Sequence, residues 1–270
     1  MSRVTSHTFF FLLTICVLAV TGRGICAPPW SQLKEQHFVV YYTPDDESLG
    51  RLVLRKAEEY YSRIALEIGY SRYSTFWTWD DRVKIFIFPD QKSYRQSTGQ
   101  PQWSTGYANK DSHLFKTRMI VTFRQEDQFL DGLLPHEISH LILHDFVGFE
   151  RTIPIWFDEG VAQLNESDKK NIAHQVMTKL IVQNQFIPLD ALMQWDIRRE
   201  TDSKKVSVFY AQSVSVVDFL IHEYGSDAFS FLCRNLKDGK DMEEAIRVAY
   251  SGSLDSVSIL QEKWMRYMKK

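Results

Sequence analysis

The sequence predicts an α+β protein in which a small mixed sheet lobe is followed by a mainly helical lobe. Strand-like runs lie before residue 130, whereas apolar residues after residue 131 recur at the spacing of an α-helix. The chain has no internal repeat and no low-complexity segment, which favours one structural unit. We therefore expect a single domain over residues 28–270, with an α/β lobe over 28–130 and a helical lobe over 131–270.

The first 26 residues have the pattern of a secretory signal peptide. Arg3 precedes an apolar run over residues 9–20 that is short for a membrane span, and small and polar residues follow it. We expect cleavage between Gly22 and Ala27 and an extracytoplasmic location, either secreted or periplasmic. An uncleaved N-terminal anchor and a lipid anchor on Cys26 are the alternatives, and we expect membrane contact only by these routes.

Charge and cysteine content narrow the class of protein further. The formal net charge is −2, and loss of the two cations Arg3 and Arg23 with residues 1–26 changes it to −4. A mildly acidic chain of mixed charges argues against nucleic acid as a partner. Cys233 is the one cysteine beyond residue 26, so we expect a buried thiol and no disulfide framework.

In the first lobe, each predicted strand is a short apolar run that ends at a turn residue or a polar segment, and the predicted helix ends at Gly69. The predicted elements are strands over 37–43, 83–88 and 119–123, a helix over 47–68, and a polar, turn-rich segment over 91–102. Five aromatic residues separate the helix from the second strand: Tyr70, Tyr73, Phe76, Trp77 and Trp79. We interpret these rings as a cap on the sheet core, and an exposed surface for a membrane, glycan or partner is the alternative.

The second lobe begins near Asp131, a candidate N-cap, with Pro135 in the first turn, where a missing N–H costs little. Apolar residues at helical spacing predict further helices over 169–183, from about 189, and over 207–224, 229–232, 242–250 and 254–268. Gly225 is the expected end of the helix over 207–224.

The most informative motif of the chain is His136-Glu137-Ile138-Ser139-His140, in an apolar segment of helical character. Residues four apart on a helix share a face, so the two imidazoles can bind a single ion. Glu137 lies on the flank of that face, where it can accept a proton from a water molecule. His144 extends the row, but it lies about 12 Å along the helix from His136 and cannot join the same ion.

Eighteen residues separate His140 from Glu159, which lies in Trp156-Phe157-Asp158-Glu159-Gly160. With this spacing the chain resembles the gluzincin class of zinc metallopeptidases, and residues 155–162 resemble the W-x-x-E-G-x-A ligand helix of MA-like peptidases. A metzincin pattern is excluded, because it requires glycine and histidine where the chain has Leu143 and Phe146. The resemblance implies a zincin-like fold and a Zn²⁺ ion bound by His136, His140 and Glu159. Its specific part covers residues 136–162, and elsewhere it rests on the order of elements.

The same resemblance implies roles for residues outside the metal site. Tyr210, in the Tyr210-Ala211-Gln212-Ser213 stretch, is a candidate to stabilise negative charge on the carbonyl oxygen, with simple packing as the alternative. Asp158 is a candidate partner for a ligand histidine. The strand before the metal helix is expected at the sheet edge, where it would pair with an extended substrate; its residues are Met119, Ile120, Val121, Thr122 and Phe123.

Taken together, these patterns predict an exported zinc-dependent peptidase that acts on peptides or proteins, with Glu137 as general base. A catalytically silent zinc-binding interaction module outside the cytoplasm is the alternative. A third possibility is an anchored structural protein in which the histidine motif is accidental, and metal analysis would identify it. The oligomeric state and the substrate sequence have no signal in the chain.

Overall fold

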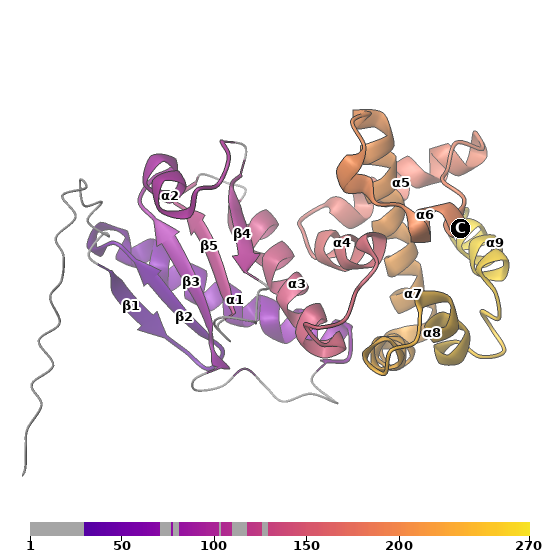
Figure 1. The fold of residues 1–270 in the computed structure, drawn as a ribbon, viewed down its shortest axis with the longest axis horizontal. Coiled ribbons are helices and arrows are strands. Elements are labelled where there is room, and N and C mark those ends of the chain that lie inside the picture. Colours follow the sequence, from indigo (N-terminus) through magenta and orange to yellow (C-terminus); the bar gives the residue numbers. More distant parts are fainter. Residues whose placement is uncertain (1–29, 71–76, 78–80, 103, 110–117, 126–128) are drawn as a thin grey trace, which may run out of the picture.

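The computed structural model describes residues 30–70, 77, 81–102, 104–109, 118–125 and 129–270. It confirms the predicted α+β class: Figure 1 shows a sheet at one end of the molecule, a cluster of helices at the other, and α3 between them. The predicted signal peptide over residues 1–26 lies outside the described residues, as do Tyr73, Phe76 and Trp79. The predicted boundary near residue 130 falls between the last strand and α3.

The sheet has five strands in the order β1-β2-β3-β5-β4, with β2, β3 and β5 parallel and the two outer strands antiparallel to their neighbours. Ile85 of β3 lies opposite Val40 of β2 on one side and Ile120 of β5 on the other. The bounds are β1 Ser31–Lys34, β2 Phe38–Tyr42, β3 Val83–Phe88, β4 Gly106–Asn109 and β5 Met119–Phe123.

This order corrects one expectation from the sequence. β5, residues 119–123, is an internal strand between β3 and β4, so its backbone is already paired on both sides. The edge next to α3 is β4, for which the sequence predicts no strand. A four-residue strand that contains Gly106 has too little alternation to be recognised from its own residues.

The sheet packs on α1, Glu47–Glu67, because the alternating residues Val83, Ile85 and Ile87 meet the apolar face of that helix in a continuous core. Tyr70 and Trp77 are 0% and 1% exposed, which confirms the core interpretation for these two rings. The segment predicted as turn-rich contains a short helix, α2 Gln91–Thr98. Asp90 caps it by accepting a hydrogen bond from Ser93 N, and Tyr94 is its buried residue.

The second lobe is helical, as predicted, and α7 runs through it. Its elements are α3 Leu134–Val147, α4 Ile155–Leu164, α5 Lys169–Val182, α6 Leu189–Gln194, α7 Ser203–Lys237, α8 Met242–Ala249 and α9 Val257–Tyr267. Gly225 has a φ of +82°, so it interrupts the helical backbone where the sequence predicted an end. The predicted helices over 207–224 and 229–232 are the two arms of α7. Cys233, on the second arm, is buried and has a free thiol, as expected.

α3 connects the two lobes because it is apolar on nearly all faces. Leu134, Ile138, Leu141 and Phe146 are at most 1% exposed, and the core continues through them from the sheet to α7. A π-helical turn, Phe129–Leu133, precedes α3, so the predicted capping role of Asp131 is wrong.

Polar contacts also fasten the two ends of α3 to the first lobe. Asp131 accepts a hydrogen bond of 2.5 Å from the Tyr60 hydroxyl of α1. Asp145 accepts hydrogen bonds from the Tyr70 hydroxyl and the Trp77 indole, and forms an ion pair with Arg118. Within the described part of the chain, no helix combines the length and the apolar character needed to cross a bilayer.

Candidate metal centre

The two motif histidines converge as predicted. His136 and His140 lie one turn apart on α3, and their Nε2 atoms are 3.0 Å apart. Two ligand atoms of a tetrahedral zinc ion are separated by roughly 3.3 Å, given metal–nitrogen distances of about 2.0–2.1 Å. The side chains therefore already have the spacing of two ligands to one ion.

Glu159 comes to the same point from α4. Its Oε2 atom lies 3.9 Å from His136 Nε2, and its Oε1 atom lies 3.8 Å from His140 Nε2. The three side chains form a group that could hold a metal ion, with ligand atoms within 4.8 Å of one another. Two imidazole nitrogens and one carboxylate suit Zn²⁺, and three protein ligands leave a fourth position for water. The donor set therefore fits the ion that the sequence predicts.

Gly160 explains how α4 can bring Glu159 to this point. A Cβ atom at Gly160 would lie 2.7 Å from the backbone oxygen of Ser213 and 2.7 Å from a methyl group of Val217, both on α7. Only glycine lets α4 lie this close to α7. The close approach that this glycine permits is therefore to the backbone of α7.

Each ligand histidine has a carboxylate partner at its other ring nitrogen. His136 Nδ1 lies 2.8 Å from Glu166 Oε1, and His140 Nδ1 lies 2.6 Å from Asp158 Oδ1. Because an ionised carboxylate only accepts hydrogen bonds, both Nδ1 atoms carry the proton and both Nε2 lone pairs face the metal position. Asp158 was a candidate for this role from the sequence, whereas Glu166 was missed.

Nothing in the residues around Glu166 predicts its partner. It lies just after α4, in the connection to α5, and only the return of the chain past α3 brings it to His136. An acidic residue a few positions after the glutamate ligand is the one signal that could have suggested it.

The charges around His136 favour a cation. Burial lowers the pKa of this imidazole, but the hydrogen bond to Glu166 and the charges of Glu137, Glu159 and Glu166 outweigh burial and raise it overall. A field that stabilises a proton on His136 also stabilises a divalent ion beside it, since both are positive charges in the same position.

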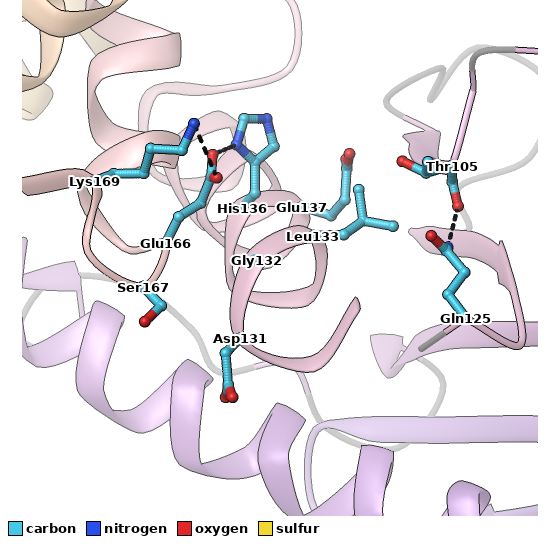
Figure 2. Close-up of a pocket in the computed structure, with 10 residues that line it drawn as sticks. All are labelled: Thr105, Gln125, Asp131, Gly132, Leu133, His136, Glu137, Glu166, Ser167 and Lys169. Atoms are coloured by element: carbon cyan, nitrogen blue, oxygen red, sulfur yellow. Dashed lines mark hydrogen bonds and ion pairs between the residues drawn. The ribbon is translucent and has the colours of Figure 1, made fainter. Parts of the chain in front are cut away.

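Glu137 faces a cavity of about 540 Å³ next to His136. Figure 2 shows His136 and Glu137 projecting from α3, with Glu166 and Lys169 on one side of the cavity and Thr105 and Gln125 on the other. The Glu137 Oε2 atom accepts a hydrogen bond of 2.7 Å from Ala108 N of β4, so the edge strand fixes the carboxylate in place.

Tyr210 lies on α7, is half-buried, and has its pKa raised first by burial and then by the charge of Glu159. Its catalytic role stays a prediction.

A sheet followed by a helix with two histidines, and a second helix with a glutamate ligand, together define a zincin type of metal centre. The family model of the peptidase MA superfamily matches residues 74–270, and the chain belongs to that superfamily.

The proteins with a similar sequence or structure include one from Bacillus subtilis and one from Bacillus anthracis. The uncharacterized protein YhcO of Bacillus subtilis (strain 168) is 24% identical over 225 residues, which cover 80% of this chain and 66% of YhcO, so the chain spans just under two thirds of that relative. The crystal structure of a functionally unknown conserved protein from Bacillus anthracis str. Ames matches with a TM-score of 0.46 and 10% identity, over 88% of this chain and 52% of that one.

Proposed function

We propose that the chain is an exported zinc metallopeptidase that hydrolyses peptide bonds in peptides or proteins. The observation that carries this proposal is the convergence of His136, His140 and Glu159, with His136 and Glu137 both lining an open cavity. Membership of the peptidase MA superfamily supports it. Export is proposed on the pattern of residues 1–26 alone, and N-terminal sequencing of the chain recovered outside the cytoplasm would test it.

The chain's own residues have separate tasks in this reaction. His136, His140 and Glu159 would hold the zinc ion, which supplies the Lewis acidity that makes a water molecule acidic near neutral pH. Glu137 accepts the proton at its carboxylate and then donates it to the leaving amine. The hydrogen bond from Ala108 N holds the Oε2 atom of Glu137 in place throughout.

For substrate recognition we propose β4 in place of residues 119–123. Ala108 N points toward Glu137 of α3 and not toward β5, so the backbone groups on the same side of β4, including those of Gly106, are not paired with β5. An extended peptide can add to such an edge by backbone hydrogen bonds.

The decisive experiment compares wild type with Glu137→Gln in zinc content and in turnover of a peptide library. Glutamine keeps an oxygen that can accept from Ala108 N, but it cannot take a proton. We expect one zinc ion per chain in both, and a fall in kcat of about 100-fold or more in the variant. Glu243→Gln, on α8, is the matched control. Equal turnover of wild type and Glu137→Gln would contradict the proposed mechanism.

The alternative is a zinc-binding interaction module without turnover. The contact between Glu137 and Ala108 N is the observation in its favour, because that hydrogen bond occupies one oxygen of the general base. Stoichiometric zinc with no turnover of any library peptide by the wild-type chain would support this alternative. Absence of zinc from the purified chain would contradict both functions.

A further inference from the structure

The strongest polar arrangement outside the ligand set is a carboxylate held between two histidines of one helix. Asp158 of α4 accepts from His140 Nδ1 at 2.6 Å through Oδ1 and from His144 Nε2 at 3.0 Å through Oδ2. His140 and His144 lie one turn apart on α3, and we call this arrangement the Asp158 bridge. The His144 and Asp158 side chains are each 14% exposed, and the ring of His144 stacks on Phe149.

The same three residues could be considered a second metal site, since their ligand atoms also lie close together. The distances argue against it. At 2.6 Å, His140 Nδ1 and Asp158 Oδ1 are a hydrogen-bonded pair, and they are too close for two ligands of one zinc ion, which are separated by roughly 3.3 Å. A metal at this point would also need the Nδ1 lone pair of His140, whose ring would then be bound on both nitrogens.

We propose that His144 is a positioning residue for the zinc site, acting through Asp158. With both oxygens of Asp158 held by α3, the carboxylate cannot rotate, so the ring of His140 keeps its Nε2 atom directed at the metal position. Asp158 also immediately precedes Glu159. Its two contacts therefore set the rotation of α4 that brings the third ligand to the same point.

This inference rests on the proposed zinc site and deepens it. A histidine that only packs against Phe149 would contribute to stability, whereas a positioning residue contributes to metal affinity and to the geometry of the bound ion. The two roles can be separated, because glutamine places an amide N–H near the position of a histidine Nε2–H and so preserves the donor.

The test measures zinc affinity by competition with a chromophoric chelator, together with the Tm of the metal-free chain. His144→Ala should weaken zinc binding by about tenfold or more, the range found when such an outer partner of a ligand is lost. His144→Gln should stay within about threefold of wild type, since it keeps the donor to Asp158. His174→Ala, which removes an exposed histidine on α5, should change nothing.

Cobalt substitution adds a readout of geometry, because the visible d–d absorption of Co²⁺ should shift in His144→Ala but not in His144→Gln. If His144→Ala does not fold, His144→Leu takes its place, since it fills the volume but cannot donate. Wild-type zinc affinity in a variant without the donor, or equal losses in the alanine and glutamine variants, would overturn the inference alone. Failure of the wild-type chain to bind zinc would overturn the proposed function as well.

Discussion

His136 and His140 are both candidate ligands on α3, but the carboxylates bonded to their Nδ1 atoms differ. The Nδ1 atom of His136 is hydrogen-bonded to Glu166. The Glu166 carboxylate lies 3.8 Å from the ammonium group of Lys169, and both residues line the cavity. The Nδ1 atom of His140 is hydrogen-bonded to Asp158 of the Asp158 bridge, and this pair of side chains is more deeply buried than His136 and Glu166. A change at Lys169 therefore acts on the carboxylate that is bonded to His136, whereas a change at His144 acts on the carboxylate that is bonded to His140.

Replacement of Tyr210 tests whether its hydroxyl group takes part in the proposed reaction. Tyr210→Phe removes a hydroxyl group without removing a candidate zinc ligand, so we expect unchanged zinc content and, if the hydroxyl stabilises the carbonyl oxygen, a fall in kcat of about tenfold or more. Steady-state kinetics on a cleaved peptide, with zinc content measured on the same sample, checks this.

Tyr224→Phe is the matched control, because Tyr224 lies on the same helix and packs against Tyr250. Both variants lose one phenolic oxygen, and only the first is expected to lose turnover. Full activity of Tyr210→Phe would assign Tyr210 to packing, which was the alternative interpretation of the sequence.

The position of β4 changes which strand is expected to bind the substrate, because β4 and not β5 forms the sheet edge next to α3. It is short, it is antiparallel to β5, and its Ala108 N–H holds Glu137. The proposed function gives such a strand two tasks, because one side is paired to the sheet and the other is directed at Glu137: it positions that carboxylate and binds the substrate backbone.

Strand addition at β4 predicts an alternating dependence on the substrate backbone. N-methylation of a peptide amide that faces β4 should lower kcat/KM by roughly two- to tenfold, the value of one net hydrogen bond. Methylation of the next amide along should have little effect, because successive backbone groups of a strand point in opposite directions.

The measurement is kcat/KM for a series of cleaved peptides, each methylated at one position on either side of the scissile bond. Peptides with the same composition and no methyl group provide the reference. A uniform effect of methylation along the peptide, or none at any position, would remove β4 as the recognition strand.

In the whole molecule, the three candidate metal ligands lie across the contact between α3 and α4, which is part of a continuous core. α3 is joined to the sheet lobe through Asp145 and Asp131, and α4 is packed closely on α7 through Gly160. A zinc ion bound to α3 and α4 therefore links the part of the core next to the sheet with the part next to α7.

Removal of metal should for this reason lower the stability of the entire chain. A ligand present at about 100 times its Kd contributes about 2.7 kcal/mol, and each kcal/mol shifts Tm by about 2–4 °C at this chain length, so chelation should lower Tm by roughly 5–10 °C. Thermal denaturation with added zinc and with a chelator measures the difference.

A variant with His136→Ala and His140→Ala together should melt at the same temperature in both conditions. If the wild-type chain also shows no difference, no zinc ion is bound across α3 and α4.

Much of the fold could be predicted because its signals are local. The alternation over 83–88 and the helical spacing over 47–68 describe elements that the structure places within one residue of the expected ends. α2 and β4 were missed because they are short and polar or glycine-containing, so their stability comes from contacts with the sheet and α3. Asp131 was assigned to a cap from its position in the chain, but tertiary contact with Tyr60 decided its role.

By itself the sequence predicted the candidate ligand set, because two histidines one helical turn apart and a glutamate on the following helix already restrict which atoms can share an ion. Only the tertiary structure decided which strand forms the sheet edge and which carboxylates hold the histidines. Pairing order depends on how the parallel strands cross over, and the contact between Glu166 and His136 joins residues 30 positions apart. Contacts between residues so far apart in the chain depend on how whole helices pack, and no short pattern of residues encodes them.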